Sequence, residues 1–289
     1  MQIGVDSYAY HRLLGEIRPG EDDPGERFPR GSLDVVAEAR ALGVELVSLE
    51  TCFLAGPDEL DVAALTEEAI GLQLVLACGH PDGLEYGASA DALEQLLAWI
   101  ELAPALGCAL VRLVAASPRV GRGADPLGST AVALATACAA AARAGVELAL
   151  ENHADLTAAE IVELLARVDD PLLGVCLDTA NAIRVGDDPL DAACLLAPHI
   201  RLVHLKDVEG GWTDAAAGPR SVAYGTGVVT LHDVLDALAG AGFDGPVCVE
   251  LGHLGAGAID ERRLVADAVN WLRREWARPA IPTPQSERT

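Results

Sequence analysis

The sequence has few aromatic residues, few basic residues and no paired cysteine motif. Phe, Trp and Tyr make up 4% of its 289 residues, so Leu, Val and Ala must fill most of a core. The seven cysteines are spread singly, mostly inside apolar runs, which is typical of reduced cysteines that serve as small core residues. Lys and Arg total 20 against 44 Asp and Glu, a formal net charge of -24. A surface this acidic repels nucleic acid and anionic lipid headgroups, so we expect neither as a partner.

The sequence also lacks recognisable targeting or membrane segments. The N-terminus, MQIGVDSYAYHR, has no basic start followed by an apolar stretch, so we see no signal peptide. The most apolar long run, residues 127–142, is rich in Ala and broken by Ser and Thr, and we expect it to be too short and too weakly apolar to span a bilayer. We therefore expect a cytoplasmic protein, and the sequence leaves both a monomer and a homo-oligomer open.

Short runs rich in Val, Leu and Ile alternate with longer amphipathic stretches along the chain. We predict strands at 2–6, 45–49, 73–77, 109–114, 146–150, 172–177, 200–205 and 247–249. We predict helices at 33–42, 60–70, 90–106, 130–144, 158–168, 189–196, 231–239 and 261–276. Strict strand–helix alternation over eight units indicates an α/β fold, a closed (β/α)8 TIM barrel, rather than an open doubly wound sheet.

This barrel is predicted to be one domain over residues 1–277, followed by a flexible, Pro-rich tail at 278–289. Two connections from a strand to the next helix are long, residues 11–32 and 206–230. Both would lie over the C-terminal face of a barrel, where active sites are built. We predict that they line a pocket there.

The last four predicted strands each end at a residue type that binds metals, namely Glu151, Asp178, His204 and Glu250. Because adjacent strands curve around one side of a barrel, side chains at the same height point to a common centre. Three carboxylates and one imidazole would form a repelling cluster there without a cation, so we predict one bound divalent metal ion. One nitrogen among hard oxygens favours Mn²⁺, with Mg²⁺, Co²⁺ and Zn²⁺ as alternatives. The competing interpretation is that strand ends are polar because they meet solvent.

Other polar residues near the predicted strand ends are candidates for substrate contacts. Arg12 is a candidate for binding an anionic substrate group, unless it is a surface residue. Lys206 follows the predicted metal ligand His204 and is a candidate for polarising a substrate oxygen, unless it pairs with Asp207. His153 is a candidate for contacting the substrate or orienting a metal ligand, unless it is a loop histidine with satisfied hydrogen bonds. The remaining candidates are Tyr8, His11, Glu50, His80 and Arg112, of which Arg112 has pairing with barrel carboxylates as its alternative.

Five motifs, LENH at 150–153, LDTAN at 177–181, VHLKD at 203–207, YGTGVVTLHDVL at 224–235 and VELG at 249–252, resemble the xylose isomerase-like barrel superfamily. The sugar phosphate isomerase/epimerase branch is the most similar, and the resemblance covers essentially the whole chain. It implies that the metal ligands are Glu151, Asp178, His204 and Glu250. Ketose 3-epimerases of this family carry His at the position of Asn181, which we keep as a candidate substrate contact, and Arg at the position of Gly210. These departures disfavour a plain ketose 3-epimerase.

A metal that binds two adjacent oxygens of an α-hydroxy ketone acidifies the carbon between them and stabilises the enediolate. Glu151 and Glu250 would then be the catalytic base and acid on opposite faces. We therefore predict a divalent-metal-dependent isomerase or epimerase whose partner is a small carbohydrate, a keto sugar or sugar derivative. The alternative is a lyase of the same superfamily, a decarboxylase or dehydratase of an oxo sugar acid or a C-glycosyl-bond lyase. An endonuclease is disfavoured by the charge of -24, and a non-enzymatic metal-containing binding barrel is the most distant alternative.

Overall fold

Eight parallel strands close into a barrel in the computed structural model, which describes residues 1–79, 82–209, 219–257 and 259–277. Each strand pairs with its neighbours in the order β1-β10-β7-β6-β5-β4-β3-β2. The strands are β1 Gln2–Asp6, β2 Leu46–Glu50, β3 Gln73–Cys78, β4 Leu110–Val114, β5 Glu147–Glu151, β6 Leu173–Asp178, β7 Ile200–Leu205 and β10 Pro246–Val249. The prediction of a (β/α)8 barrel is confirmed, and each strand lies within one or two residues of its predicted bounds.

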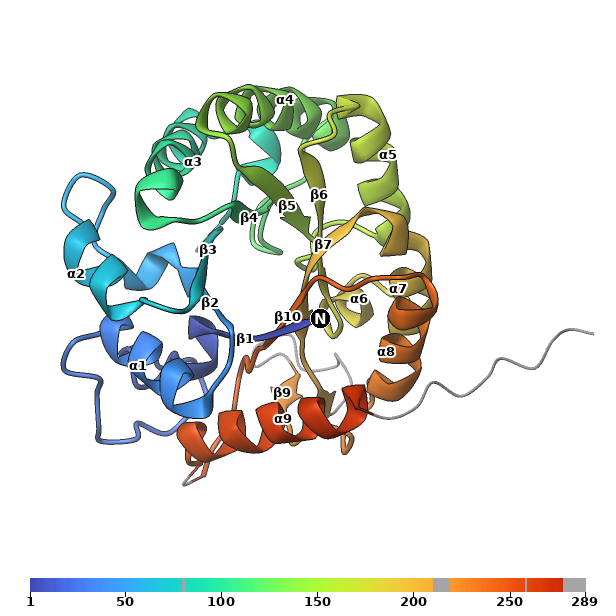
Figure 1. Cartoon of the computed structure of the whole chain (residues 1–289). Helices are drawn as coiled ribbons and strands as arrows, with labels where there is room; N and C mark the ends of the chain where they lie inside the picture. The colour runs from blue at the N-terminus through green and yellow to red at the C-terminus, as the bar shows by residue number, and fades with distance from the viewer. Residues whose placement is uncertain (80–81, 210–218, 258, 278–289) are drawn as a thin grey trace, which may run out of the picture.

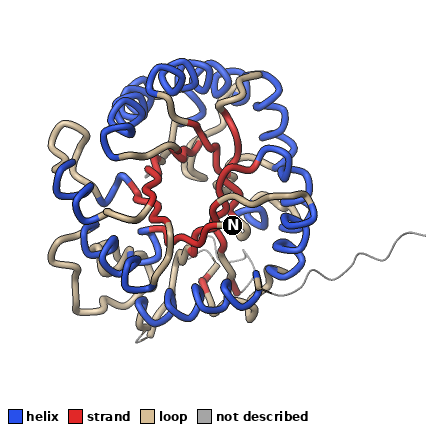
Figure 2. Tube along the Cα trace, in the orientation of Figure 1, coloured by secondary structure: helices blue, strands red, loops and turns tan. Residues whose placement is uncertain are grey.

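The helices form an outer ring around the strands (Figure 1, Figure 2). They are α1 Ser32–Leu42, α2 Val62–Glu68, α3 Ala90–Leu102, α4 Pro126–Ala144, α5 Ala158–Val168, α6 Asn181–Arg184, α7 Pro189–Leu196, α8 Leu231–Gly240 and α9 Glu261–Trp276. The segment predicted as one helix over 90–106 divides at Ala103, because Pro104 opens a separate 3-10 turn. Conversely, α4 begins before its predicted start, since Asp125 caps it and Pro126 fits the first helical turn.

Helix α4 differs from expectation in one further respect. Its 19 residues are long and apolar enough, by length and composition, to cross a membrane, whereas we expected this run to be too short and too weakly apolar. In the structure, however, it occupies a place in the outer ring between α3 and α5 (Figure 1). Leu134, Ala137 and Ala141 on this helix are buried in the core. Packing against the barrel therefore accounts for its apolar side.

The core has two parts, one inside the barrel and one between the strands and the helices. The inner part is a small cluster of Leu46, Val75, Leu110, Ala149, Cys176, Leu202 and Cys248. Gly4 faces this cluster, and a Cβ at this position would come within 2.7 Å of the Cys248 sulfur. Five of the seven cysteines are buried and all seven are free, in line with the prediction of small, reduced core residues.

The connection from β7 to α8 adds a short antiparallel pair, β8 Val208–Glu209 and β9 Arg220–Ser221. Asp207 organises the end of this connection. Its carboxylate accepts hydrogen bonds from the backbone N–H groups of Gly225 and Gly227, each at 2.9 Å. The two glycines therefore shape the loop that leads into α8, and Asp207 is not the partner of Lys206.

Candidate metal and substrate site

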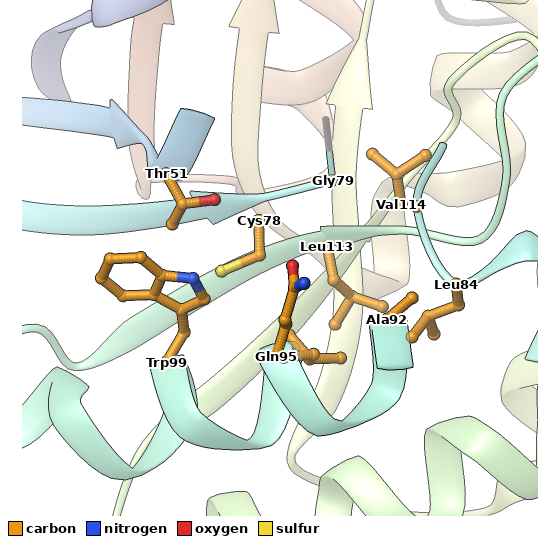
Figure 3. Close-up of a pocket in the computed structure, with 11 residues that line it drawn as sticks. Thr51, Cys78, Gly79, Leu84, Ala92, Gln95, Trp99, Leu113 and Val114 are labelled. Atoms are coloured by element: carbon orange, nitrogen blue, oxygen red, sulfur yellow. The ribbon is translucent and has the colours of Figure 1, made fainter. Parts of the chain in front are cut away.

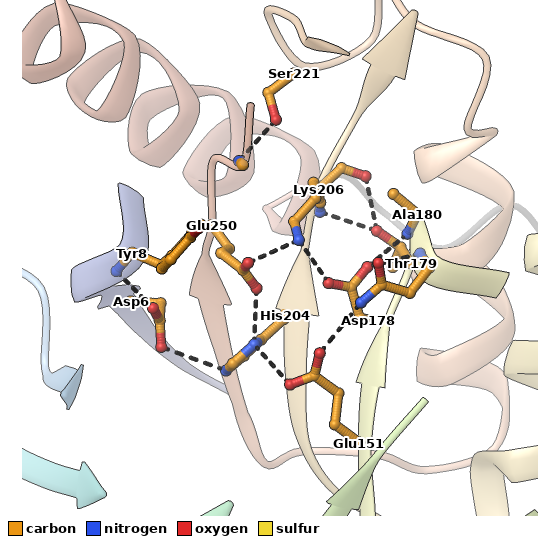
Figure 4. Close-up of polar contacts among 12 residues, drawn as sticks. Asp6, Tyr8, Glu151, Asp178, Thr179, Ala180, His204, Lys206, Ser221 and Glu250 are labelled. Carbon is orange, nitrogen blue, oxygen red and sulfur yellow. Dashed lines mark hydrogen bonds and ion pairs between the residues drawn. The ribbon is translucent and has the colours of Figure 1, made fainter. Parts of the chain in front are cut away.

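Four adjacent strands bring the predicted metal ligands to the same end of the barrel (Figure 4). Glu151 and Asp178 are the last residues of β5 and β6, His204 is the penultimate residue of β7, and Glu250 directly follows β10. Asp178 and His204 are register partners in adjacent strands, which sets their side chains at one height. All four side chains are buried.

His204 lies at the centre of the cluster. Its Nδ1 is 2.8 Å from Glu250 Oε2 and 3.7 Å from Glu151 Oε2. Ligand atoms of Asp178, His204 and Glu250 all lie within 4.8 Å of one another, and Glu151, Cys176 and His204 form a second such group. His204 belongs to both groups. Within each group the separations are short enough for one cation to be shared.

The donor atoms of the cluster fit a divalent metal. Glu151 Oε2, Asp178 Oδ2, Glu250 Oε2 and both ring nitrogens of His204 are buried and form no hydrogen bond of regular geometry within the described residues. Charged neighbours do lie close to these oxygens, since Arg112, His204 and Lys206 nitrogens are each 2.8 Å from Glu151 Oε2, Glu250 Oε2 and Asp178 Oδ2, respectively. Buried polar atoms without such partners cost free energy unless a bound ion or water satisfies them. Carboxylate oxygens with one imidazole nitrogen suit Mn²⁺, Mg²⁺, Co²⁺ or Zn²⁺.

Lys206, the only lysine in the sequence, lies against the same carboxylates. Its Nζ is 2.8 Å from Asp178 Oδ2 and 2.7 Å from Glu250 Oε1 (Figure 4). Burial alone would lower the pKa of Lys206, but the two carboxylates raise it above its ordinary value. The ammonium therefore stays charged and supplies part of the positive charge that the acidic cluster requires.

The charges in the cluster perturb one another strongly. Burial alone would raise the pKa of Glu250, yet the positive charges of Lys206 and His204 hold it well below its usual range. Burial alone would lower the pKa of His204, but Cys176 and Glu250 raise it well above its usual range. Burial raises the pKa of Asp178 against the opposing charge of Lys206. Without a metal, His204 is thus held as an imidazolium, and a metal ion would replace its proton.

Surrounding groups orient the candidate ligands. Asp178 Oδ1 accepts hydrogen bonds from the backbone N–H groups of Ala180 and Asn181, which leaves Oδ2 for the cluster. The Asn181 side chain donates to Glu151 Oε1 at 3.1 Å. Arg112 pairs with Glu50 on one side and lies 2.8 Å from Glu151 Oε2 on the other. Arg112 is therefore held between barrel carboxylates, the alternative given for it above.

Sequence reasoning missed Asp6, the last residue of β1. Asp6 is fully buried, and its Oδ2 lies 3.6 Å from His204 Nε2 (Figure 4). Burial raises its pKa, while the charge of His204 opposes the shift. The signal that located the four ligands, an acidic residue at a strand end, was present here as well. It went unused because β1 is separated from the other three carboxylate strands along the chain, although β10 is its neighbour in the barrel.

The structure places Tyr8 and His11 in a small network of the β1–α1 connection. The two rings stack at 5.1 Å, the Tyr8 hydroxyl donates to Glu16 Oε1 at 2.7 Å, and His11 Nε2 lies 3.0 Å from Glu21 Oε1. His153 lies closer to the cluster, in the electrostatic field of Arg112 and Lys206. Burial, reinforced by these charges, lowers its pKa to about 3, so its imidazole is neutral at physiological pH. His80 and Gly210 lie outside the described residues.

Arg12 does not lie where a substrate carboxylate would reach it. Its side chain is 1% exposed, and its Nε lies 3.3 Å from Glu261 Oε1. Its two terminal nitrogens donate to the backbone carbonyls of Asp22 and Ile259 at 3.1 and 2.7 Å. Protein groups thus occupy the guanidinium, which fastens the β1–α1 connection to the start of α9. The placement corrects the expectation that Arg12 is available to a substrate anion.

Two recesses open near the C-terminal ends of the strands. One lies between β3, β4 and α3 and is lined by Cys78, Gln95, Trp99 and Leu113 among others, with none of the candidate ligands in its wall (Figure 3). The other adjoins the cluster of candidate ligands, since Asn181 and Lys206 line it together with Arg18, Arg184 and His253. The second recess is therefore the one that a substrate at the cluster would enter.

The chain belongs to the xylose isomerase-like TIM barrel family, whose pattern it matches over residues 35–275. It is 28% identical over 250 residues to the uncharacterized protein YihM of Escherichia coli K12, covering 85% of this chain and 71% of that one. It is 23% identical over 217 residues to 3-oxo-isoapionate decarboxylase of Pectobacterium atrosepticum, covering 73% and 72%.

Solved structures support the same fold. A structure of L-ribulose 3-epimerase superposes with a TM-score of 0.72 at 20% identity, covering 95% of this chain and 94% of that one. The IOLI protein, described with a bound zinc atom, superposes with a TM-score of 0.69 at 19% identity and 96% coverage of both chains. At these identities the likeness concerns the fold alone, a fold that serves many different reactions.

Proposed function

We propose that this protein is a divalent-metal-dependent isomerase or epimerase of a keto sugar or a sugar derivative. The observation that carries the proposal is that Glu151, Asp178 and Glu250 gather around His204, buried at the C-terminal end of the barrel, where His204 belongs to two overlapping groups of potential metal ligands. These residues would hold the metal, which we infer to be Mn²⁺ from the donor set. The solved relative with zinc indicates that such barrels accept a divalent ion.

The metal would supply polarisation of a carbonyl and an adjacent hydroxyl, which makes the hydrogen on the carbon between them acidic. The protein must then accept and return that proton. Glu151 and Glu250 come from β5 and from the end of β10, two strands on either side of β6 and β7. They therefore approach a substrate from different sides, and a proton taken by one and returned by the other would invert a carbon centre.

Their neighbours suit the two carboxylates to these roles. Glu250 is bound on one oxygen by Lys206 and faces His204 with the other, so it stays ionised and is the stronger candidate for the base that begins the cycle. Glu151 is held in place by Arg112 and by the Asn181 amide. These contacts fix both carboxylates in position, so little reorganisation is required when the proton moves.

Decarboxylation of an oxo sugar acid is the second candidate. It uses the same polarised carbonyl, but carbon dioxide leaves in place of the proton. Two observations support it: the likeness to a decarboxylase, and the cationic residues Arg18, Arg184 and Lys206 in the wall of the adjoining recess. Asn181 also stands where ketose 3-epimerases of the family carry a histidine.

A panel of keto sugars and oxo sugar acids, incubated with Mn²⁺-loaded enzyme in D₂O and followed by NMR, tests the proposal. An isomerase or epimerase incorporates solvent deuterium at the carbon next to the carbonyl and forms a product of unchanged carbon number. A decarboxylase releases carbon dioxide and places one deuterium where the carboxylate left. No exchange and no product across the panel, with metal bound, would contradict both candidates and favour a binding barrel.

A further inference from the structure

The recess beside the metal cluster has an unusual wall for so acidic a protein. It encloses about 370 Å³ of empty space, its open mouth included. Four of the residues that line it carry basic side chains, and they come from four separate segments: Arg18 from the β1–α1 connection, Arg184 from α6, Lys206 after β7, and His253 after β10. The chain contains only 20 Lys and Arg against 44 acidic residues, so three of these cations at one recess is a marked local concentration.

The guanidinium group of Arg18 has no partner among the described residues. Its side chain is half-buried, and it forms no ion pair or side-chain hydrogen bond with any described residue. The nearby acid Glu21 does not neutralise it, because the Glu21 carboxylate is occupied by His11 and by the backbone N–H groups of Arg18 and Leu254. A guanidinium offers five N–H donors, and most of those on Arg18 therefore remain available to a ligand.

Arg184 lies within electrostatic reach of Arg18. Burial lowers the pKa of Arg184, and the positive charge of Arg18 is the next largest cause of the shift. Both guanidinium groups line the recess and repel each other. An anion bound there would offset this repulsion, and the planar fork of arginine matches the geometry of carboxylate and phosphate oxygens.

We propose that this recess is a subsite for the anionic group of the substrate, a carboxylate or a phosphate monoester, with Arg18 and Arg184 as its binding residues. Asn181 and Lys206 line the recess and also contact the metal cluster, so a bound molecule can extend from one to the other. The inference rests on the proposed function, because the reacting end of that molecule is placed at the metal. It assigns the substrate to the sugar acids or sugar phosphates and excludes neutral sugars. It also gives Arg18 the role that the sequence suggested for Arg12.

Three probes that share a ketohexose chain and differ mainly at C6 test the proposal: D-fructose, D-fructuronate and D-fructose 6-phosphate. Binding is measured by isothermal titration calorimetry on the Mn²⁺-loaded and the metal-stripped protein, so the readout does not depend on turnover. We expect one of the two anions to bind at least about tenfold more tightly than D-fructose, the effect of a charge-assisted contact of about 1.4 kcal/mol. The tighter anion identifies the group as carboxylate or phosphate.

Substitution then locates the site. Arg18→Met should abolish the preference for the anion over D-fructose, and Arg184→Met should reduce it. Arg263→Met is the matched control, because the Arg263 side chain is 80% exposed on α9 and does not line the recess. Its anion preference should equal that of the unmodified protein. A full preference in Arg18→Met, or no preference for either anion in the unmodified protein, would overturn the proposal.

The outcomes separate this inference from the proposed function. If the protein binds Mn²⁺ and transforms a neutral sugar with no anion preference, the subsite is wrong and the proposed function stands. If an anion binds through Arg18 but no metal binds at the cluster, the subsite stands and the metal chemistry is wrong.

Discussion

Replacing Lys206 with Met tests how the acidic cluster is held together. In the structure the ammonium bridges Asp178 and Glu250 at 2.8 and 2.7 Å, with side-chain exposures of 11% for Lys206, 0% for Asp178 and 7% for Glu250. Methionine retains most of the volume but leaves both carboxylates without their counter-ion. Removing one partner of a buried ion pair costs about 3–5 kcal/mol, so we expect a loss of this size in the unfolding free energy of the metal-free variant.

The size of the loss should depend on pH and on metal. Burial already raises the pKa of Asp178, and removal of the opposing Lys206 charge raises it further. A carboxyl whose pKa is higher in the folded protein than in the unfolded chain binds more protons when folded, so its contribution to stability falls as pH rises. The cost should therefore be small near pH 5 and full near pH 8. Mn²⁺ should stabilise the variant more than the unmodified protein, because it replaces the missing cation.

Urea unfolding in EDTA and in Mn²⁺, at both pH values, measures these effects. Arg263→Met is the control, with a change within about 0.5 kcal/mol because the side chain is exposed. A metal-free Lys206→Met protein within about 1 kcal/mol of the unmodified one at pH 8 would refute the reasoning, since such a loss is below that of any broken buried pair. If Mn²⁺ stabilised both proteins equally, the idea that the metal ion takes the place of the missing Lys206 ammonium would be refuted.

Three further predictions follow from individual contacts. Replacing Glu151 or Glu250 with Gln should lower turnover by about 10²–10⁴ with the fold intact by circular dichroism, and near-normal rates in both would contradict their roles. Affinity for Mn²⁺ should rise about tenfold per pH unit between pH 6 and 8, because the ion must displace the proton that His204 holds through its raised pKa. An affinity that titration calorimetry finds to be independent of pH would contradict this prediction. Arg12→Met should lower the unfolding free energy by about 3–5 kcal/mol, because the buried Glu261 carboxylate loses its partner, and it should leave KM unchanged. A raised KM in a stable variant would show that Arg12 contacts the substrate.

The barrel and the gathering of the candidate metal ligands at one end of it were predictable from sequence because both depend on local patterns. Strand–helix alternation sets the topology, and the side chains of Glu151, Asp178 and His204 follow from where their strands end. Arg12 and Arg18 were not distinguishable in the same way. Both lie in one irregular connection, and only the fold shows that Glu261, 249 positions away in the chain, neutralises the first and leaves the second available.

Lys206 shows the same limit. Its neighbour in sequence, Asp207, is the obvious partner, but consecutive residues at the end of a strand point to opposite sides. Lys206 therefore turns to Asp178 and Glu250, while Asp207 binds the backbone of the loop before α8. Pairings of this kind depend on strand direction and burial, which sequence spacing alone does not specify.

Metal content measured on purified variants tests the central claim most directly. His204 belongs to both groups of potential ligands, Asp178 to one and Cys176 to the other. Asp178→Asn keeps an oxygen for the backbone N–H groups of Ala180 and Asn181 but presents an amide in place of Oδ2. Elemental analysis should find about one divalent ion per chain in the unmodified protein and in Cys176→Ala, and little in His204→Ala or Asp178→Asn. No ion in the unmodified protein, or a full complement in Asp178→Asn, would contradict the metal site proposed for this barrel.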